Sequence, residues 1–496
     1  MSVKCKTLLV LFLICGCIFL SHESKAVPSY TRTYAVDCAR CHNMWGGLNR
    51  GGATFKQSGY RAIDGKDLNQ VEDDDVYTGG QFHLPASFPI SIITGVGYDY
   101  RKEKRQASDS TTNTRTSSSF ALEDASLFLT SSLGEHLSAF IEFPLYETKA
   151  WEFTPTGPAE ANDTSLTKTF RFENKNAVFE VAKFWWNNLI PGTPRDSINL
   201  LFGISHPPLA YSPGKVRLSV NQYLIYDRRA LELISPVHLT SEDGDGLLSE
   251  NASEYLFRLS EPQIFVELNG MLVLGGKVTD VSDRNTLWIS YNLGIANGSN
   301  IETDNNNKKD IYGRFKVNMY SQSVGVFAYY SANTYDDELR DSASLVNGGI
   351  MSGQHGNNSM IRLGTDLNLN LRPLGFPVSI QNQYMYNRES NPTGFGEEFK
   401  WQGGFHQINW QPKDESIAYV RYDWIHGDYF DDTVFGGVTR ASVNEWDVVV
   451  GFQHLIYQNL KLIGEYRHHK FENKLYQPAT ASLTDDGFTV RAMIAF

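Results

Sequence analysis

The chain has 496 residues, a formal net charge of −12 and a mean hydropathy of −0.33. An acidic chain without a basic stripe is not typical of a nucleic-acid-binding protein, so we expect no nucleic-acid partner. Its length allows about two or three ordinary domains. Of its 5 cysteines, only Cys38 and Cys41 would remain after cleavage behind residue 26, so no disulfide framework is expected.

Residues 1–26 have the pattern of a signal peptide. Lys4 and Lys6 give a positively charged start. Residues 7–20 are almost entirely apolar but too few to span a membrane as a helix. Small residues precede the expected cleavage site after Ala26, and lipidation at Cys17 is the alternative. The sequence therefore predicts an exported chain.

A haem attachment motif, Cys38-Ala39-Arg40-Cys41-His42, lies close behind the signal peptide. Two thiols separated by two residues can form thioether bonds to the two vinyl groups of a haem, and the next histidine can ligate the iron. We therefore expect one covalently bound haem c, held by Cys38, Cys41 and His42. Cleavage after Ala26 would remove the other cysteines, which are Cys5, Cys15 and Cys17.

Cys38 and Cys41 have three alternative roles. A thioredoxin-like redox pair would lie in a βαβ pattern. A structural zinc ion would require four protein ligands, and a disulfide across so short a loop would add little stability. The sequence shows none of these contexts, so residues 27–85 are predicted to form a monohaem cytochrome c-type domain. That domain is too small to bury a large core without its cofactor.

The second axial ligand of the haem iron is not fixed by the motif. Within residues 27–85, Met44 follows His42 too closely to reach the opposite face of a haem easily. His83 is the other candidate, and we predict it as the distal ligand, although most histidines of this kind lie on the surface. A residue of the barrel wall is the alternative.

From about Ser87 onward, apolar and polar residues alternate with period two, as in strands with one apolar face. Residues 366–371 and 488–496 are the clearest examples. About seven short polar breaks alternate with about eight long polar stretches, which predicts about sixteen antiparallel strands with both chain ends on the short-turn side. Residues 86–496 are therefore predicted to form an outer-membrane porin-like β-barrel of a Gram-negative bacterium.

A soluble β-sandwich would also alternate, and it remains the alternative to a barrel. Two features favour the barrel. The alternating strand ends on Phe496, and the aromatic content of 13% would suit aromatic girdles at the membrane interfaces. We therefore expect contact with outer-membrane lipid.

Residues 28–60 carry a longer pattern around the haem motif, and they resemble the outer-membrane cytochrome–porin fusions of iron-oxidising bacteria. Those proteins are proposed iron oxidases with a monohaem N-terminal domain. Ala35 stands where the family usually has Gly, and Gly46 stands where it usually has Pro. The matching residues are Pro28, Tyr30, Arg32, Leu48, Gly52, Phe55, Lys56, Gly59 and Tyr60.

The resemblance implies that extracellular Fe(II) is oxidised and that the electron passes through the haem to a periplasmic cytochrome or other small electron carrier. This would be an Fe(II):cytochrome c oxidoreductase. A lumen of about sixteen strands is wide enough to hold a small haem domain as a plug, and the domain would otherwise lie on the periplasmic side. The alternatives are outward electron transfer to an external acceptor, and a solute porin whose haem plug acts as a redox gate or sensor.

Overall fold

The computed structural model describes most of the predicted barrel and part of the N-terminal segment. Among the described residues, no helix is both long enough and apolar enough to cross a bilayer. The predicted signal peptide, Cys38 and Phe496 lie outside the described residues. The residues that the structure describes are 30, 41–44, 47–61, 76–77, 83–84, 90–106, 112–133, 136–146, 180–211, 218–228, 230, 233, 258–274, 286–298, 307–319, 321–334, 357–391, 398–432, 438–457, 459–473 and 481–495.

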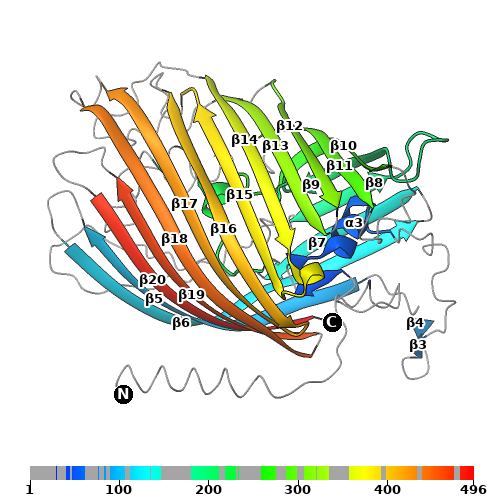
Figure 1. Ribbon diagram of the computed structural model, residues 1–496, viewed down its shortest axis with the longest axis horizontal. Helices are drawn as coiled ribbons and strands as arrows, with labels where there is room; N and C mark the ends of the chain where they lie inside the picture. The colour runs from blue at the N-terminus through cyan, green and yellow to red at the C-terminus, as the bar shows by residue number, and fades with distance from the viewer. Residues whose placement is uncertain are drawn as a thin grey trace.

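Sixteen strands form one closed antiparallel barrel (Figure 1). Each strand pairs with the next one along the chain, and β20 pairs with β5 to close the ring. The strands are β5 (Ile90–Gln106), β6 (Thr112–Leu133), β7 (Leu137–Tyr146), β8 (Val181–Trp186), β9 (Asn199–Ser205), β10 (Gln263–Leu274), β11 (Leu287–Ala296), β12 (Asp310–Met319), β13 (Gln322–Thr334), β14 (Asn357–Asn370), β15 (Val378–Glu389), β16 (Phe399–Lys413), β17 (Ser416–Asp432), β18 (Val438–Tyr457), β19 (Leu460–Asn473) and β20 (Ala481–Ala495).

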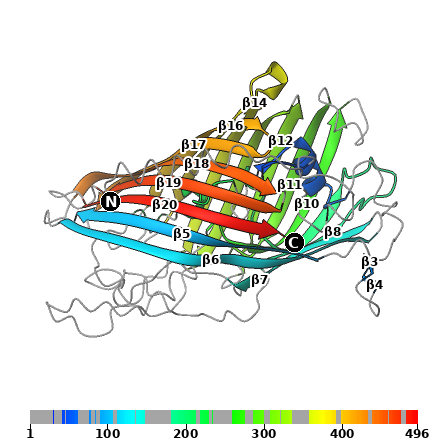
Figure 2. The ribbon, with the colours of Figure 1, turned by 90° about the horizontal axis from the view of Figure 1, so that it is seen from below.

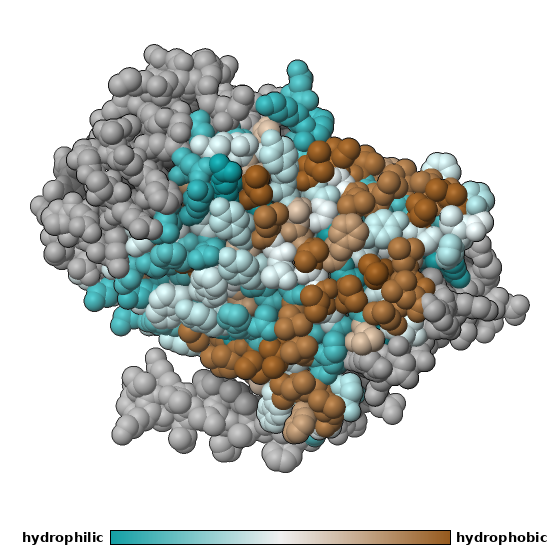
Figure 3. Space-filling model, turned by 45° about the horizontal axis from the view of Figure 1, so that its top comes forward, coloured by the Kyte–Doolittle hydropathy of each residue, from teal (hydrophilic) through white to brown (hydrophobic). Residues whose placement is uncertain are grey.

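The wall of the barrel is apolar outside and polar inside. On β10, the side chains of Val266 and Leu268 are exposed, whereas those of Glu267 and Asn269 are buried. Figure 3 shows apolar residues gathered over the outer wall. This arrangement inverts that of a soluble protein and is the one that a hydrocarbon layer requires. The alternation read from the sequence is therefore the alternation of a membrane barrel.

The connections between strands differ in length at the two ends of the barrel. Asp414 and Glu415 alone join β16 to β17, whereas residues 206–262 join β9 to β10. The first strand starts and the last strand ends on the short-turn side, which is the periplasmic side in outer-membrane barrels. The predicted strand number and the predicted asymmetry are both confirmed.

Short elements from the N-terminal segment lie at this short-turn end. They are β1 (His42–Met44), β2 (Gly47–Leu48) and α3 (Arg50–Gln57). The Asn49 side chain caps α3 by accepting a hydrogen bond of 3.0 Å from the backbone N–H of Gly52. Figures 1 and 2 both show α3 within the ring of strands, near the end where the C-terminus lies.

Four further short elements complete the described fold. Helix α4 (Leu224–Asp227) belongs to the long β9–β10 connection, and a 3₁₀ turn, η4 (Arg372–Leu374), lies between β14 and β15. Strands β3 (Val76–Tyr77) and β4 (His83–Leu84) form a separate hairpin that does not join the barrel sheet.

A charged side chain on the lipid face should destabilise the barrel. Leu268→Arg places a guanidinium near the middle of β10 on the outer face, and we expect it to reduce the free energy of unfolding by about 2–4 kcal/mol. Urea titration of folding into lipid vesicles measures this change. Leu268→Val is the matched control and should change the midpoint little. Equal stability of the two variants would contradict the assignment of this face to lipid.

Candidate functional site

The haem motif lies against the start of α3. Cys41 and His42 are the motif residues that the structure describes, and both are half-buried. The backbone N–H of Asn49 donates a hydrogen bond of 3.0 Å to the carbonyl oxygen of Cys41. A Cβ at Gly52 would lie 2.0 Å from that same oxygen, so α3 approaches the motif as closely as a glycine allows.

The environment of His42 fits an iron ligand. Its Nδ1 atom is buried and makes no hydrogen bond among the described parts of the chain. Burial, followed by the charge of Lys461, lowers the pKa of His42 to about 4, and a backbone hydrogen bond at Gly47 acts in the opposite direction. The imidazole is therefore neutral at physiological pH, which is the form that binds a metal.

Residues 41–61, the plug segment, are hydrogen-bonded to the inside of the barrel. The guanidinium of Arg50 donates to the carbonyl of Thr286 at 3.0 Å. The side-chain amide of Gln57 donates to the carbonyls of Gly270 and Tyr291 at 3.3 and 3.2 Å. Both partners of Gln57 are in barrel strands, so α3 is docked on the wall at β10 and β11.

A buried ion pair holds the end of the plug segment. Arg61 pairs with Asp196 of the short β8–β9 connection, and both side chains are fully buried. The Nε of Arg61 also donates to the carbonyl of Ser58 at 3.0 Å. Gly59 and Tyr60 have φ values of +71° and +59°, so the chain turns sharply just before this anchor.

Tyr60 joins the plug segment to the wall through aromatic contacts. Its ring stacks on Phe140 of β7 with centroids 4.9 Å apart, and it meets Trp185 of β8 edge-on at 5.4 Å. Within the N-terminal segment, Tyr60 also stacks on Tyr30 at 5.5 Å and contacts Phe55 at 5.8 Å. Burial, and then the charge of Glu142, raises the pKa of Tyr60, so its phenol is neutral.

A second segment enters the lumen from the opposite end. The lumen loop comprises the described residues 206–211 and 218–228 of the β9–β10 connection. Its Leu218 shares an apolar cluster with Met44 of the plug segment. Glu465 of β19 accepts hydrogen bonds from the Ser219 hydroxyl at 2.9 Å and from the backbone N–H groups of Val220 and Asn221 at 3.0 Å. The two segments therefore meet inside the barrel.

Aromatic side chains fix the middle of the lumen loop. Tyr223 stacks on Phe405 of β16 with centroids 4.3 Å apart, and Tyr211 meets the same ring edge-on at 5.1 Å. The guanidinium of Arg421 lies 4.6 Å from the centre of the Tyr223 ring. It also donates to the carbonyls of Asn221 and Gln222 at 3.0 Å.

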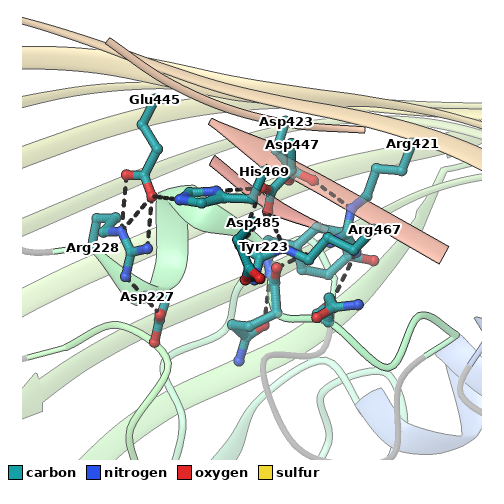
Figure 4. A network of polar contacts seen from close by, with 12 residues as sticks. Tyr223, Asp227, Arg228, Arg421, Asp423, Glu445, Asp447, Arg467, His469 and Asp485 are labelled. Atoms are coloured by element: carbon teal, nitrogen blue, oxygen red, sulfur yellow. Dashed lines mark hydrogen bonds and ion pairs between the residues drawn. The ribbon is translucent and has the colours of Figure 1, made fainter. Parts of the chain in front are cut away.

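A chain of charged groups ties the lumen loop to the wall (Figure 4). Arg228 donates to Glu445 of β18, and the same carboxylate lies 3.5 Å from the Nε2 of His469. The Nδ1 of His469 lies 2.5 Å from Asp447, which pairs with Arg467 at 2.8 Å. Among the described residues, no group of three or more His, Cys, Asp or Glu side chains is placed to hold a metal ion.

The structure describes some of the predicted site residues and not others. Cys41 and His42 are adjacent in the chain and lie beside the start of α3, where Asn49 donates to the Cys41 carbonyl, and Cys38 lies outside the described residues. His83 is in the β3–β4 hairpin opposite Tyr77, and its side chain is outside the description, so its role as distal ligand stays a prediction. Sequence reasoning missed the anchoring pair of Arg61 with Asp196, because its partners are 135 residues apart in the chain.

Loss of the buried ion pair should release the plug segment. Asp196→Ala deprives the buried Arg61 guanidinium of its carboxylate, which costs about 3–5 kcal/mol. We expect trypsin to cleave after Arg50 faster in this variant, as followed by mass spectrometry of the detergent-solubilised protein.

Asp414→Ala is the control for that experiment. It removes the exposed pair between Arg372 and Asp414, which has a 3.1 Å separation at the same end of the barrel. Such a pair contributes at most about 1 kcal/mol, so cleavage should stay at the wild-type rate. Equal cleavage of the two variants would show that the plug segment is not held by Arg61.

No family model and no curated protein sequence matches this chain. Solved outer-membrane structures are similar to it in fold. An anion-selective porin from Comamonas acidovorans matches with a TM-score of 0.44 and 10% identity, over 82% of this chain and 100% of the porin. OmpT of Vibrio cholerae matches with a TM-score of 0.42 and 8% identity, over 85% of this chain and 100% of OmpT. The channel DcaP of Acinetobacter baumannii matches with a TM-score of 0.40 and 11% identity, over 82% of this chain and 96% of DcaP.

Proposed function

We propose that this chain is an outer-membrane c-type cytochrome that oxidises extracellular Fe(II) and passes single electrons to a periplasmic carrier. The observation that carries the proposal is the position of the haem motif. Cys41 and His42 lie inside a membrane barrel, on a segment that the wall holds by hydrogen bonds and by a buried ion pair. In this reading the chain is an Fe(II):cytochrome c oxidoreductase.

The residues that would hold the cofactor are few. Cys38 and Cys41 would form the thioether bonds, and the neutral imidazole of His42 would ligate the iron. When bound, one haem c supplies a single one-electron centre that accepts an electron from Fe(II) and gives it to the carrier. Helix α3 and its cap Asn49 fix the backbone of Cys41 by direct contact.

Distance is the main physical difficulty of the reaction. The hydrocarbon layer is about 30 Å thick, and electron tunnelling falls off exponentially with distance. A haem site at the short-turn end of the lumen is within reach of a periplasmic carrier that approaches from that side. Farther from that end, aromatic and charged side chains of the lumen loop, among them Tyr223 and Arg228, contact the wall. The direction of electron flow is carried by the family resemblance of residues 28–60.

A solute porin with a redox-sensitive plug is the second candidate, because a sixteen-strand barrel is wide enough for an aqueous channel. The described lumen weighs against free diffusion. The plug segment occupies the short-turn end, and the lumen loop meets it at the cluster of Met44 and Leu218. Outward electron transfer would use the same parts and differs in the reduction potential of the haem.

Anaerobic addition of Fe(II) tests the proposed reaction. The purified protein in detergent, with its single covalent haem verified, should pass rapidly to the reduced visible spectrum. Cys41→Ser, which lacks one thioether, is the control for haem attachment and should lose most of its covalent haem. A haem that stays oxidised with Fe(II) and is fully reduced by dithionite would move the assignment to outward transfer or to a redox-gated pore.

Close contact between α3 and the motif gives a second test. Gly52→Ala would place a Cβ 2.0 Å from the carbonyl oxygen of Cys41, so the helix must move away from the motif. We expect several-fold less covalent haem per chain, measured by haem absorbance and intact mass. Gly47→Ala is the matched control, because its Cβ would lie 3.5 Å from the nearest atom. Full haem loading of Gly52→Ala would contradict this arrangement.

A further inference from the structure

Three lysine side chains, the lumen lysines Lys56, Lys183 and Lys316, lie where the plug segment meets the wall. Lys56 is in α3, Lys183 is on β8 and Lys316 is on β12. Side chains two residues apart share one face of a strand. Lys183 therefore lies on the same face of β8 as the buried Trp185, and Lys316 on the same face of β12 as the buried Arg314. Both of these faces are the inner face of the barrel.

The docking of α3 brings Lys56 close to Lys316. Gln57, the residue after Lys56, donates its side-chain amide to the carbonyl of Tyr291 on β11 at 3.2 Å. The residue before Tyr291 is Ser290, which is the cross-strand partner of Lys316. The anchor point of α3 and the backbone of Lys316 are therefore on neighbouring strands, and the charge of Lys56 acts on Lys316.

The turn after α3 brings Lys56 close to Lys183 as well. The cross-strand partner of Lys183 on β7 is Phe140, the ring on which Tyr60 stacks. On the other side of Lys183, its partner on β9 is Gly203, which presents no side chain to the lumen. The charge of Lys56 acts on Lys183 as it does on Lys316. The three ammonium groups therefore belong to one part of the lumen, and Gly203 leaves room beside them.

The lumen lysines have an excess of positive charge. Among the described residues, none of their ammonium groups makes a hydrogen bond or an ion pair. The nearby Arg314 and Asp366 neutralise each other through contacts of 2.9 and 2.8 Å. Two other carboxylates act on the lysines, Glu267 and Glu142, and Glu267 is held by hydrogen bonds from two asparagines and a tyrosine. Three lysines thus face two carboxylates, neither of which contacts them directly.

Solvent reaches this part of the lumen. The side chain of Lys56 is exposed, and those of Lys183 and Lys316 are half-buried, although the strands surround all three. Ammonium groups gathered without counterions repel one another, and an anion placed among them removes that repulsion. A cleft lined by cations and enclosed by walls of low dielectric concentrates small anions from solution.

We propose that the lumen lysines bind a small oxyanion, with inorganic phosphate as the representative ligand. An ammonium group is a compact charge with three donors, which suits the oxygens of such an anion. The plug segment supplies one cation and the wall supplies two, so the bound anion joins α3 to β8 and β12. The site does not depend on the proposed function, because it requires no haem.

Calorimetric titration of inorganic phosphate into the detergent-solubilised full-length protein, at low ionic strength, tests the site. We expect saturable binding. Lys56→Gln, Lys183→Gln and Lys316→Gln should each weaken it several-fold, because each removes one of the charges that hold the anion. Lys183→Arg keeps the charge and should retain most of the affinity.

Arg101→Gln is the matched control. Arg101 is a cation on the inner face of β5, but Asp485 already pairs with it at 2.8 Å, so its loss should leave phosphate binding at the wild-type level. Absence of saturable binding to the wild-type protein would overturn the proposal. Equal weakening by Arg101→Gln would also overturn it, because the effect would then come from the overall charge of the lumen. If one of the lysine variants does not fold, the other two decide the outcome.

Discussion

Every second side chain of a barrel strand must point into the lumen, and the rest of this structure depends on that constraint. Residues that point outward face lipid and must be apolar. The polar half of each strand therefore points inward, as at Glu465 and Asp447. A polar group inside a low-dielectric lumen is stable only when it is hydrogen-bonded or paired. The plug segment and the lumen loop supply those partners, and the wall holds both segments in return.

This exchange of partners explains how the short plug segment keeps a defined position. Residues 41–61 contain one short helix, and they bury too little apolar surface to fold firmly alone. The wall contributes the missing contacts at β7, β8, β10, β11 and β16. The lumen loop is held to the wall by the ion pair of Arg228 with Glu445. The barrel thus serves as the remainder of the core of the N-terminal segment.

Sequence reasoning succeeded where the signal is local. The period of two predicted the strands, as in residues 366–370 of β14, and the lengths of the polar breaks predicted which end carries the short turns. The haem at Cys38, Cys41 and His42 stays a prediction, because it rests on the spacing of the motif alone. The position of the lumen loop inside the barrel could not be predicted from the sequence, because the polar stretch to which it belongs looks like a surface loop. Its position depends on pairs such as Arg228 with Glu445, whose partners are 217 residues apart.

Electron transfer across a membrane tests the account most directly. The protein is placed in lipid vesicles with its long loops outside, with an oxidised small cytochrome c enclosed within, and Fe(II) is added outside under anaerobic conditions. The account predicts that the enclosed cytochrome is reduced, and that Cys41→Ser vesicles show only the rate of protein-free vesicles. Absence of that reduction, in vesicles whose protein carries its haem in the correct orientation, would contradict it.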